Sequence, residues 1–295
     1  MLKRIFTCLI LLLLSAASVP AEVGSTIPDG GTSGMADIYI LSQILEDPDP
    51  VTRVWRQFNP NGPNRAVLNP DGEINGDGMP SVLITSTPRI PLVAWSRNSA
   101  QGYDVVLSRF ESGAWTTPEV LAGSLEDELD PALVLDPDTG DVHLFYWIDG
   151  TTPKVMHRKA DPALASWTAA VQVSNPADAS CRPAGVFHDG VLRVVYEVHD
   201  YGFNQTPRQV VLSRWDGAAW IPEIMAISLF DDRMDPRVHS HNGTLWIDWI
   251  DDTGEAAWTR WSPSTGWDPV QYEPFSDLME REFHVRGAIR ALAVQ

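Results

Sequence analysis

Acidic residues and one arginine recur about every fifty residues, a spacing typical of repeated structural units. They are Asp130, Arg182, Asp235 and Glu280, and the first three each precede a proline. If the fold gathers them, their carboxyl groups could hydrolyse a glycosidic bond, because that reaction needs one carboxyl as proton donor and another as base or nucleophile. Asp130, Asp235 and Glu280 are then the candidate catalytic acids, and Arg182 is a candidate ligand-binding residue. The alternative, which we favour, is that Asp-Pro starts a turn in each unit.

A polar and aromatic segment, residues 199–205, is the second candidate site. Tyr201 and Phe203 can stack on the apolar faces of sugar rings, while the Asn204 amide can hydrogen-bond to sugar hydroxyls. The segment therefore suits a carbohydrate ligand. An ordinary surface loop is the alternative.

Oxygen-bearing residues alternate in a third segment, at Glu73, Asn75 and Asp77. Alternating oxygen ligands around a glycine turn suit calcium, and the segment resembles the Asn-Gly-Asp-Gly calcium loops of integrin-type propellers. Ser81 stands where an aspartate closes the loop in that family, so a plain Asn-Gly turn is the alternative. No cofactor other than calcium is expected.

Cysteine and histidine residues give weaker signals for a metal. Cys181 has no partner once Cys8 is removed with the N-terminal segment, and a free cysteine is usually buried and unreactive. His239 and His241 lie two residues apart on one strand face and could bind a metal. Because no third histidine or cysteine is placed beside them by the repeat, we interpret both as structural.

The elements that must position these residues are short strands. Strand-forming runs separated by Gly, Pro, Asn and Asp continue from residue 80 onward, which predicts an all-β fold. The segment 106–110 recurs as 211–215, and Trp115, Trp167, Trp220 and Trp267 lie 52, 53 and 47 residues apart. Four strands in each such period are typical of β-propeller blades. The predicted blades are residues 79–123, 129–175, 181–228 and 234–273, with first strands starting at Pro80, Pro131, Pro183 and Pro236.

Two fragments remain outside these four blades. Residues 283–294 match the first two strands of a blade, and residues 37–44, followed by Trp55, match the last two. Together they predict a composite fifth blade that closes the ring and covers its edge strands. The fold predicted is thus a five-bladed β-propeller closed by N- and C-terminal strands. Six blades are the alternative, with one blade in residues 45–80, a stretch that reads as loop because it is rich in Pro, Gly and Asn.

The turns between third and fourth strands resemble a known motif. Residues 108–115 and 213–220 resemble the Asp-box of sialidase-type propellers, with serine and tryptophan at the right separation but Phe110 and Trp215 in place of the aspartate. In that family the box is a structural turn away from the catalytic mouth, so the resemblance implies the fold more than an activity. Sialidases also carry an Arg-Ile-Pro near the first blade, and here Arg89 begins such a tripeptide, directly before a second strand instead of on a first one.

The N-terminus predicts export. Two basic residues, a short apolar run and small residues up to Ala21 are typical of a signal peptide, and no segment is apolar for long enough to span a membrane. We expect a signal peptide at 1–21, a flexible segment at 22–34 and a single propeller domain at 35–295, secreted or periplasmic. The net charge of −18 disfavours nucleic acid as a partner.

These observations favour a non-catalytic propeller that recognises glycans or takes part in another interaction. A glycoside hydrolase using the recurring acids, resembling sialidases or arabinanases, is the alternative, and a protein-binding scaffold is the third interpretation because one fold can serve all three functions.

Overall fold

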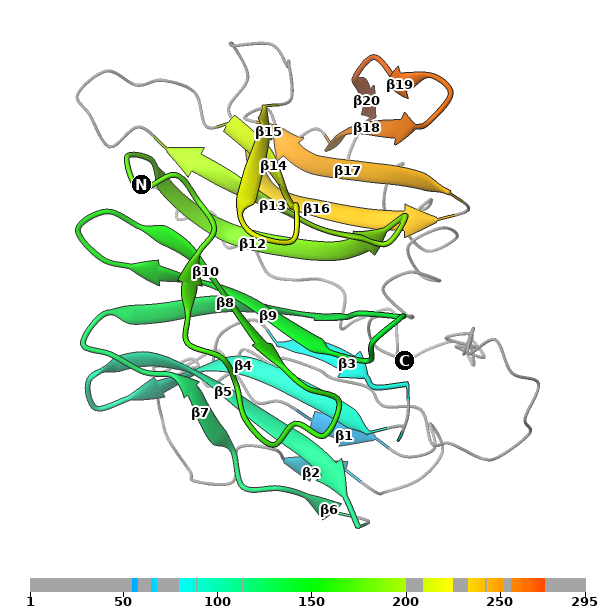
Figure 1. Ribbon diagram of the computed structural model, residues 1–295. Coiled ribbons are helices and arrows are strands. Elements are labelled where there is room, and N and C mark those ends of the chain that lie inside the picture. The colour runs from blue at the N-terminus through cyan, green and yellow to red at the C-terminus, as the bar shows by residue number, and fades with distance from the viewer. Residues whose placement is uncertain are drawn as a thin grey trace, which may run out of the picture.

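The computed structural model describes residues 55–57, 65–67, 80–86, 88, 90–112, 114–199, 209–224, 233–241, 243–251 and 256–273. All the regular structure in these ranges is β-strand, arranged in antiparallel sheets that follow one another along the chain (Figure 1). The prediction of an all-β protein is therefore confirmed for this part of the chain. It contains no helix of the length and apolarity needed to cross a membrane.

Four sheets have four or five strands each, and successive strands pair, except that the last strand of each five-stranded sheet pairs with that sheet's third strand. The first contains β3 (Ser81–Ile84), β4 (Pro91–Ser99), β5 (Gly102–Glu111), β6 (Ala114–Trp115) and β7 (Glu119–Ala122). The second contains β8 (Asp127–Leu135), β9 (Val142–Asp149), β10 (Lys154–Ala160) and β11 (Val171–Gln172). The third contains β12 (Ala179–His188), β13 (Val191–His199), β14 (Gln209–Trp215) and β15 (Trp220–Ile224). The fourth contains β16 (Arg233–His241), β17 (Thr244–Asp251), β18 (Ala256–Ser262), β19 (Gly266–Trp267) and β20 (Gln271–Glu273).

These sheets coincide with the four blades predicted from the repeat. Their first strands, however, begin before the prolines in three of the four sheets, because the residues ahead of each proline already pair with the second strand. In the second sheet, for example, Asp127 pairs with Asp149 and Leu129 with Trp147. In the second, third and fourth sheets the predicted start at the proline is therefore wrong by three to four residues.

The sequence suggested that the stretch 45–80 is loop, but part of it is strand. Strands β1 (Trp55–Gln57) and β2 (Arg65–Val67) form a two-stranded antiparallel sheet. The fragments of the composite blade, 37–44 and 283–294, lie outside the described residues, so the count of five blades stays a prediction.

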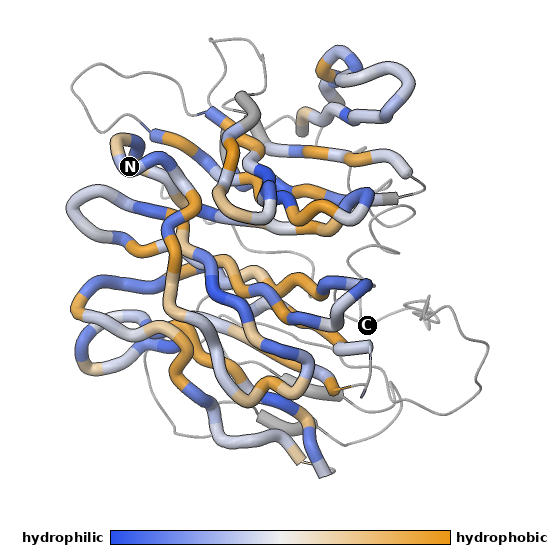
Figure 2. Tube along the Cα trace, in the orientation of Figure 1, coloured by the Kyte–Doolittle hydropathy of each residue, from blue (hydrophilic) through white to orange (hydrophobic). Residues whose placement is uncertain are grey.

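The hydrophobic core lies between neighbouring sheets, and alternate side chains of one strand face different neighbours. On β9, Leu144 packs in a cluster shared with the first sheet, whereas Phe145 packs in a cluster shared with the third. A third cluster joins the third and fourth sheets. Strands buried on both faces are hydrophobic along much of their length, and Figure 2 shows apolar residues along the strands with polar residues interspersed among them.

Polar contacts also connect neighbouring sheets. The backbone N–H of Leu133 donates to the Ser81 hydroxyl at 2.9 Å, between β8 and β3. His188 Nδ1 and the Ser240 hydroxyl lie 2.9 Å apart, between β12 and β16. Such contacts fix successive first strands relative to one another, and these strands carry the recurring Asp and Arg residues.

Candidate functional site

The recurring residues occupy a shared and unusual backbone position. Asp130, Arg182 and Asp235 have φ angles of 48°, 51° and 54°, in the left-handed region. Each lies within a first strand, where the pairing register shifts between residues 129 and 132, 181 and 184, and 234 and 237. Left-handed backbone is uncommon outside glycine, asparagine and aspartate, and strained positions of this kind cluster at functional sites.

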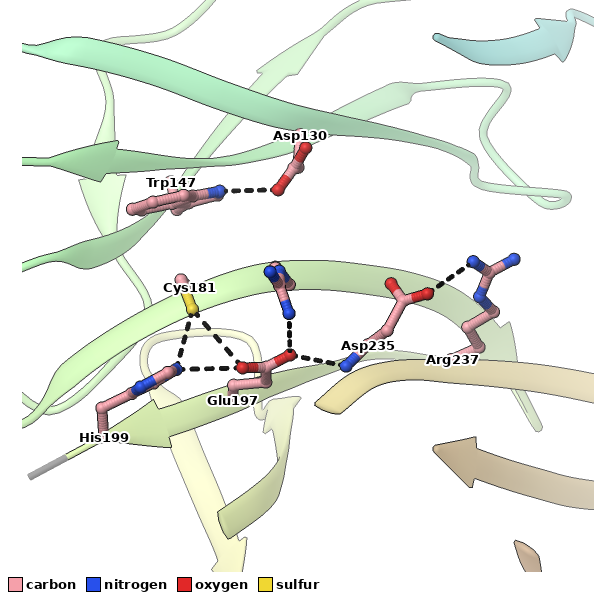
Figure 3. A network of polar contacts seen from close by, with 8 residues as sticks. Asp130, Trp147, Cys181, Glu197, His199, Asp235 and Arg237 are labelled. Atoms are coloured by element: carbon pink, nitrogen blue, oxygen red, sulfur yellow. Dashed lines mark hydrogen bonds and ion pairs between the residues drawn. The ribbon is translucent and has the colours of Figure 1, made fainter. Parts of the chain in front are cut away.

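This geometry corrects the turn interpretation. The residues before the prolines lie at β-bulges inside strands, where bulges re-aim side chains, and do not start turns. The two described carboxylates also bond to side chains instead of backbone N–H groups. Asp130 Oδ2 accepts from Trp147 Nε1 at 2.9 Å, and Asp235 Oδ2 pairs with Arg237 Nη2 at 2.9 Å (Figure 3).

Asp130 is the most perturbed of these carboxyls. Burial raises the pKa of Asp130, and the charges of Asp235 and Glu197 act in the same direction. The Trp147 hydrogen bond and the positive charge of Arg182 oppose the rise. Asp130 is thus a partly shielded carboxyl whose neutral form is favoured more than in water, a property that suits proton donation.

Glu197 on β13 connects the bulges of the third and fourth sheets. Its carboxylate has no exposed surface and accepts from Arg182 Nη1 at 3.0 Å, from the backbone N–H of Asp235 and from His199 Nε2 at 2.9 Å. Despite burial, the pKa of Glu197 is lowered, because the hydrogen bonds from His199 and Asp235 and the charge of Arg182 favour the ionised form. Asp130, Arg182 and Asp235 on the first strands, together with Glu197 on the second strand beside them, are called the first-strand cluster below.

Cys181 and His199 extend this cluster along the third sheet. Cys181 Sγ lies 3.2 Å from His199 Nε2 and 3.8 Å from Glu197 Oε2. Burial, together with the negative charge of Glu197, raises the pKa of the Cys181 thiol to about 12. The prediction of a buried cysteine is confirmed, and a thiol with this pKa is not a nucleophile at neutral pH.

Several predicted site residues lie outside the described part of the chain. These are Glu280, Arg89, the loop residues Tyr201, Phe203 and Asn204, and the calcium candidates Glu73, Asn75 and Asp77. Their roles stay predictions. Of the two predicted histidines, His239 lies 3.2 Å from an Asp248 carboxylate oxygen, which fits a structural role.

Sequence reasoning missed Glu197 as a site residue and placed His199 only at the start of the candidate carbohydrate segment, residues 199–205. Glu197 stands in an apolar run of β13, between Tyr196 and Val198. The signal was present, because a carboxylate in a strand whose neighbours are buried needs a partner. His199 was a possible partner on the same strand face, two residues on, but Arg182 could not be named because it reaches Glu197 only through the pairing of β12 with β13.

Aromatic pairs occupy the turns that resemble an Asp-box. Phe110 and Trp115 have ring centroids 5.6 Å apart, and Trp215 and Trp220 have centroids 5.4 Å apart. The Asp216 carboxylate accepts the backbone N–H groups of Ala218 and Ala219, and these bonds lower the pKa of Asp216. These residues form structural turns at the ends of the third strands.

Comparison with solved structures shows similarity of fold. The chain superposes on the Hadza microbial sialidase Hz136 with a TM-score of 0.54 and 14% identity, over 74% of this chain and 53% of the sialidase. The superposition on a leech intramolecular trans-sialidase has a TM-score of 0.52 and 11% identity, over 66% of this chain and 50% of the trans-sialidase. The superposition on an ulvan lyase, a polysaccharide lyase, has a TM-score of 0.51 and 9% identity, over 72% of this chain and 58% of the lyase.

These neighbours are β-propellers, and all three act on glycans or are complexed with them. The chain spans about half the length of the sialidases that it resembles. Neither a protein-family model nor a curated protein matches the sequence. What these structures share with the chain is therefore the β-propeller fold.

Proposed function

We propose that this protein recognises a carbohydrate at the first-strand cluster. The observation that carries the proposal is the convergence of two carboxylates and a guanidinium, at equivalent bulges of three successive sheets, on one small region. Carboxylates accept hydrogen bonds from sugar hydroxyls, and the Arg182 side chain, 43% exposed, can donate to them. Ligand sites typically combine a few such polar groups with aromatic surface, which Trp147 supplies beside Asp130.

The adjoining sequence supports the same ligand class. Strand β13 ends at His199, beside the cluster, and the segment with Tyr201, Phe203 and Asn204 follows directly. Glycan-acting proteins share the fold. Export after cleavage near Ala21, to the periplasm or the medium, is part of the proposal because extracellular glycans are met there.

Glycoside hydrolysis is the second candidate function, and one observation favours it. The pKa of Asp130 is raised by burial while the pKa of nearby Glu197 is lowered by its hydrogen bonds. Carboxyls whose pKa values are pushed apart are typical of acid and base pairs. Binding without catalysis fits better, because both oxygens of Glu197 are already bonded and its side chain has no exposed surface.

A glycan array with three proteins tests the proposal. The parent protein should bind a defined set of glycans, and the Arg182→Ala variant should lose them. Asp189→Asn, a change at an exposed turn residue, is the matched control and should bind as the parent does. Absence of binding to every glycan would reject carbohydrate recognition and favour a protein-binding scaffold.

A panel of aryl glycosides separates the two candidate functions. We expect no turnover by the parent protein. Turnover that Asp130→Asn abolishes and Asp189→Asn retains would replace the binding function with hydrolysis.

A further inference from the structure

Three side chains of unlike chemistry meet beside the first-strand cluster. A thiol, a carboxylate and an imidazole, from Cys181, Glu197 and His199, each offer a ligand atom, and these atoms all lie within 4.8 Å of one another. We propose that these three residues bind a zinc ion. The proposal does not depend on carbohydrate recognition, and it can be tested without a glycan.

The distances between the three ligand atoms fit a tetrahedral ion. Zinc bonds of about 2.3 Å to sulfur and about 2.0 Å to nitrogen or oxygen place tetrahedral ligand atoms roughly 3.3–3.6 Å apart. The separations are 3.2 Å from Cys181 Sγ to His199 Nε2, 3.8 Å from that sulfur to Glu197 Oε2, and 2.9 Å from the imidazole to the carboxylate. Each differs from the ideal by about half an ångström or less, a change that side-chain rotation can supply.

Strand pairing holds the three residues in place. Cys181 on β12 pairs directly with Glu197 on β13, and His199 lies two residues along the same strand, on the same face. Ligands on paired strands keep their mutual positions better than ligands on loops. Cys181 and Glu197 are almost fully buried, whereas the His199 side chain is 21% exposed and marks the side from which an ion enters.

The charges around the site permit a cation. Arg182 bonds to Oε1 of Glu197, while Cys181 and His199 contact Oε2, so the oxygen that would bind zinc is the one that the guanidinium does not occupy (Figure 3). Asp130 adds a negative charge that acts on Cys181 and Arg182. The positive charge of Arg182 is therefore compensated by carboxylates on both sides.

The ligand types select among metals. Calcium and magnesium prefer oxygen ligands alone, whereas zinc accepts sulfur, nitrogen and oxygen together. Three protein ligands leave a fourth position for water or for a group of a bound molecule. The site is thus distinct in chemistry from the calcium segment that the sequence suggested at residues 73–77.

Metal titration of the full chain in a Cys8→Ser background tests the proposal, since Cys181 is then the only thiol. After removal of bound metal, zinc should bind with a stoichiometry of one in competition with a chromogenic chelator. Cobalt in place of zinc should give the near-ultraviolet absorption of a thiolate-bound ion. Calcium should not displace either metal.

Two ligand variants and one control locate the ion. Cys181→Ser should abolish the cobalt–thiolate absorption, and His199→Gln should weaken zinc at least about tenfold, which is the lower end of the loss caused even by outer partners of a metal ion. His239→Gln, at the other predicted histidine site, should bind zinc as the parent does. Thermal unfolding of each variant shows that it is folded.

The proposal is overturned if the folded parent does not bind zinc, or if zinc binding survives both ligand variants unchanged. It is equally overturned if His239→Gln removes the ion. Should Cys181→Ser fail to fold, His199→Gln decides alone, because His199 lies at the partly exposed end of β13.

Discussion

Two buried glutamates should respond oppositely to the same substitution. Glu128 and Glu197 are 2% and 0% exposed. Burial nevertheless sets the direction of the pKa shift of Glu128, whereas hydrogen bonds set the direction of the pKa shift of Glu197. The pKa of Glu128 is raised, chiefly by burial, while the pKa of Glu197 is lowered by His199, the Asp235 backbone and Arg182. Glutamine keeps the shape and removes the charge, so at pH 7 Glu197→Gln should destabilise the fold and Glu128→Gln should not.

The magnitude for Glu197 follows from its three hydrogen bonds. A bond to a charged group contributes about 1.5–3 kcal/mol and a neutral bond about 0.5–1.5 kcal/mol, so each loses about 1 kcal/mol when the charge is removed. The share of Arg182 is smaller because its side chain is 43% exposed and solvent screens it. Glu197→Gln should therefore lower the free energy of unfolding by about 2 kcal/mol, while Glu128→Gln leaves it unchanged or raises it slightly.

Urea unfolding of the parent and both variants, at pH 7 and at lower pH, measures these changes. The deficit of Glu197→Gln should shrink as pH falls below about 4.3, the pKa of an unfolded glutamate, because the parent then loses the ionised Glu197 as well. Glu128 has the opposite effect on the parent. Because its pKa is raised in the folded state, the parent gains stability as the pH falls through that raised pKa. Equal changes in the two variants at pH 7 would refute the assignment of opposite environments.

Four further outcomes are expected. Gly185→Ala should destabilise by about 1–3 kcal/mol in urea unfolding, because its Cβ would lie 2.7 Å from Phe145 Cε2 and 2.8 Å from Val134 Cγ2; an unchanged midpoint would contradict this packing. Burial lowers the pKa of His143 to about 4 and of His157 to about 3, so stability should fall as pH drops below about 6.5, and nuclear magnetic resonance should show both neutral at pH 5.5. Deleting residues 288–295 should abolish cooperative thermal unfolding if the composite blade exists, and a cooperative transition like that of the parent would disprove it. Calorimetry with chelator and then millimolar calcium should show a raised midpoint if Glu73, Asn75 and Asp77 bind the ion, and equal midpoints would exclude it.

The repeat made most of the described fold predictable. Tryptophans at blade intervals and the recurrence of the segment 106–110 as 211–215 located four sheets, because blades repeat one packing unit whose apolar residues must recur. The same alignment brought Asp130, Arg182 and Asp235 to equivalent positions, and the structure places them at equivalent bulges. The left-handed backbone at these positions was not predictable, since a proline ordinarily holds the preceding residue in an extended conformation.

The contacts between sheets were beyond sequence reasoning. Glu197 of the third sheet reaches Asp235 of the fourth, and His188 of the third sheet reaches Ser240 of the fourth. Such contacts depend on register and on the angle between sheets, neither of which the spacing of residues encodes. For residues 45–80 the error was the reverse, because a composition rich in Pro, Gly and Asn was interpreted as loop although Trp55–Gln57 and Arg65–Val67 pair as antiparallel strands.

The measurement that tests the central claim most directly is calorimetric titration of one glycan, chosen from the array, into folded parent and variant proteins. Arg182→Ala and Asp130→Asn should each weaken binding at least about tenfold, about 1.4 kcal/mol, and Asp189→Asn should bind as the parent does. Glycan binding that both cluster variants retain unchanged would contradict a carbohydrate site at the first-strand cluster.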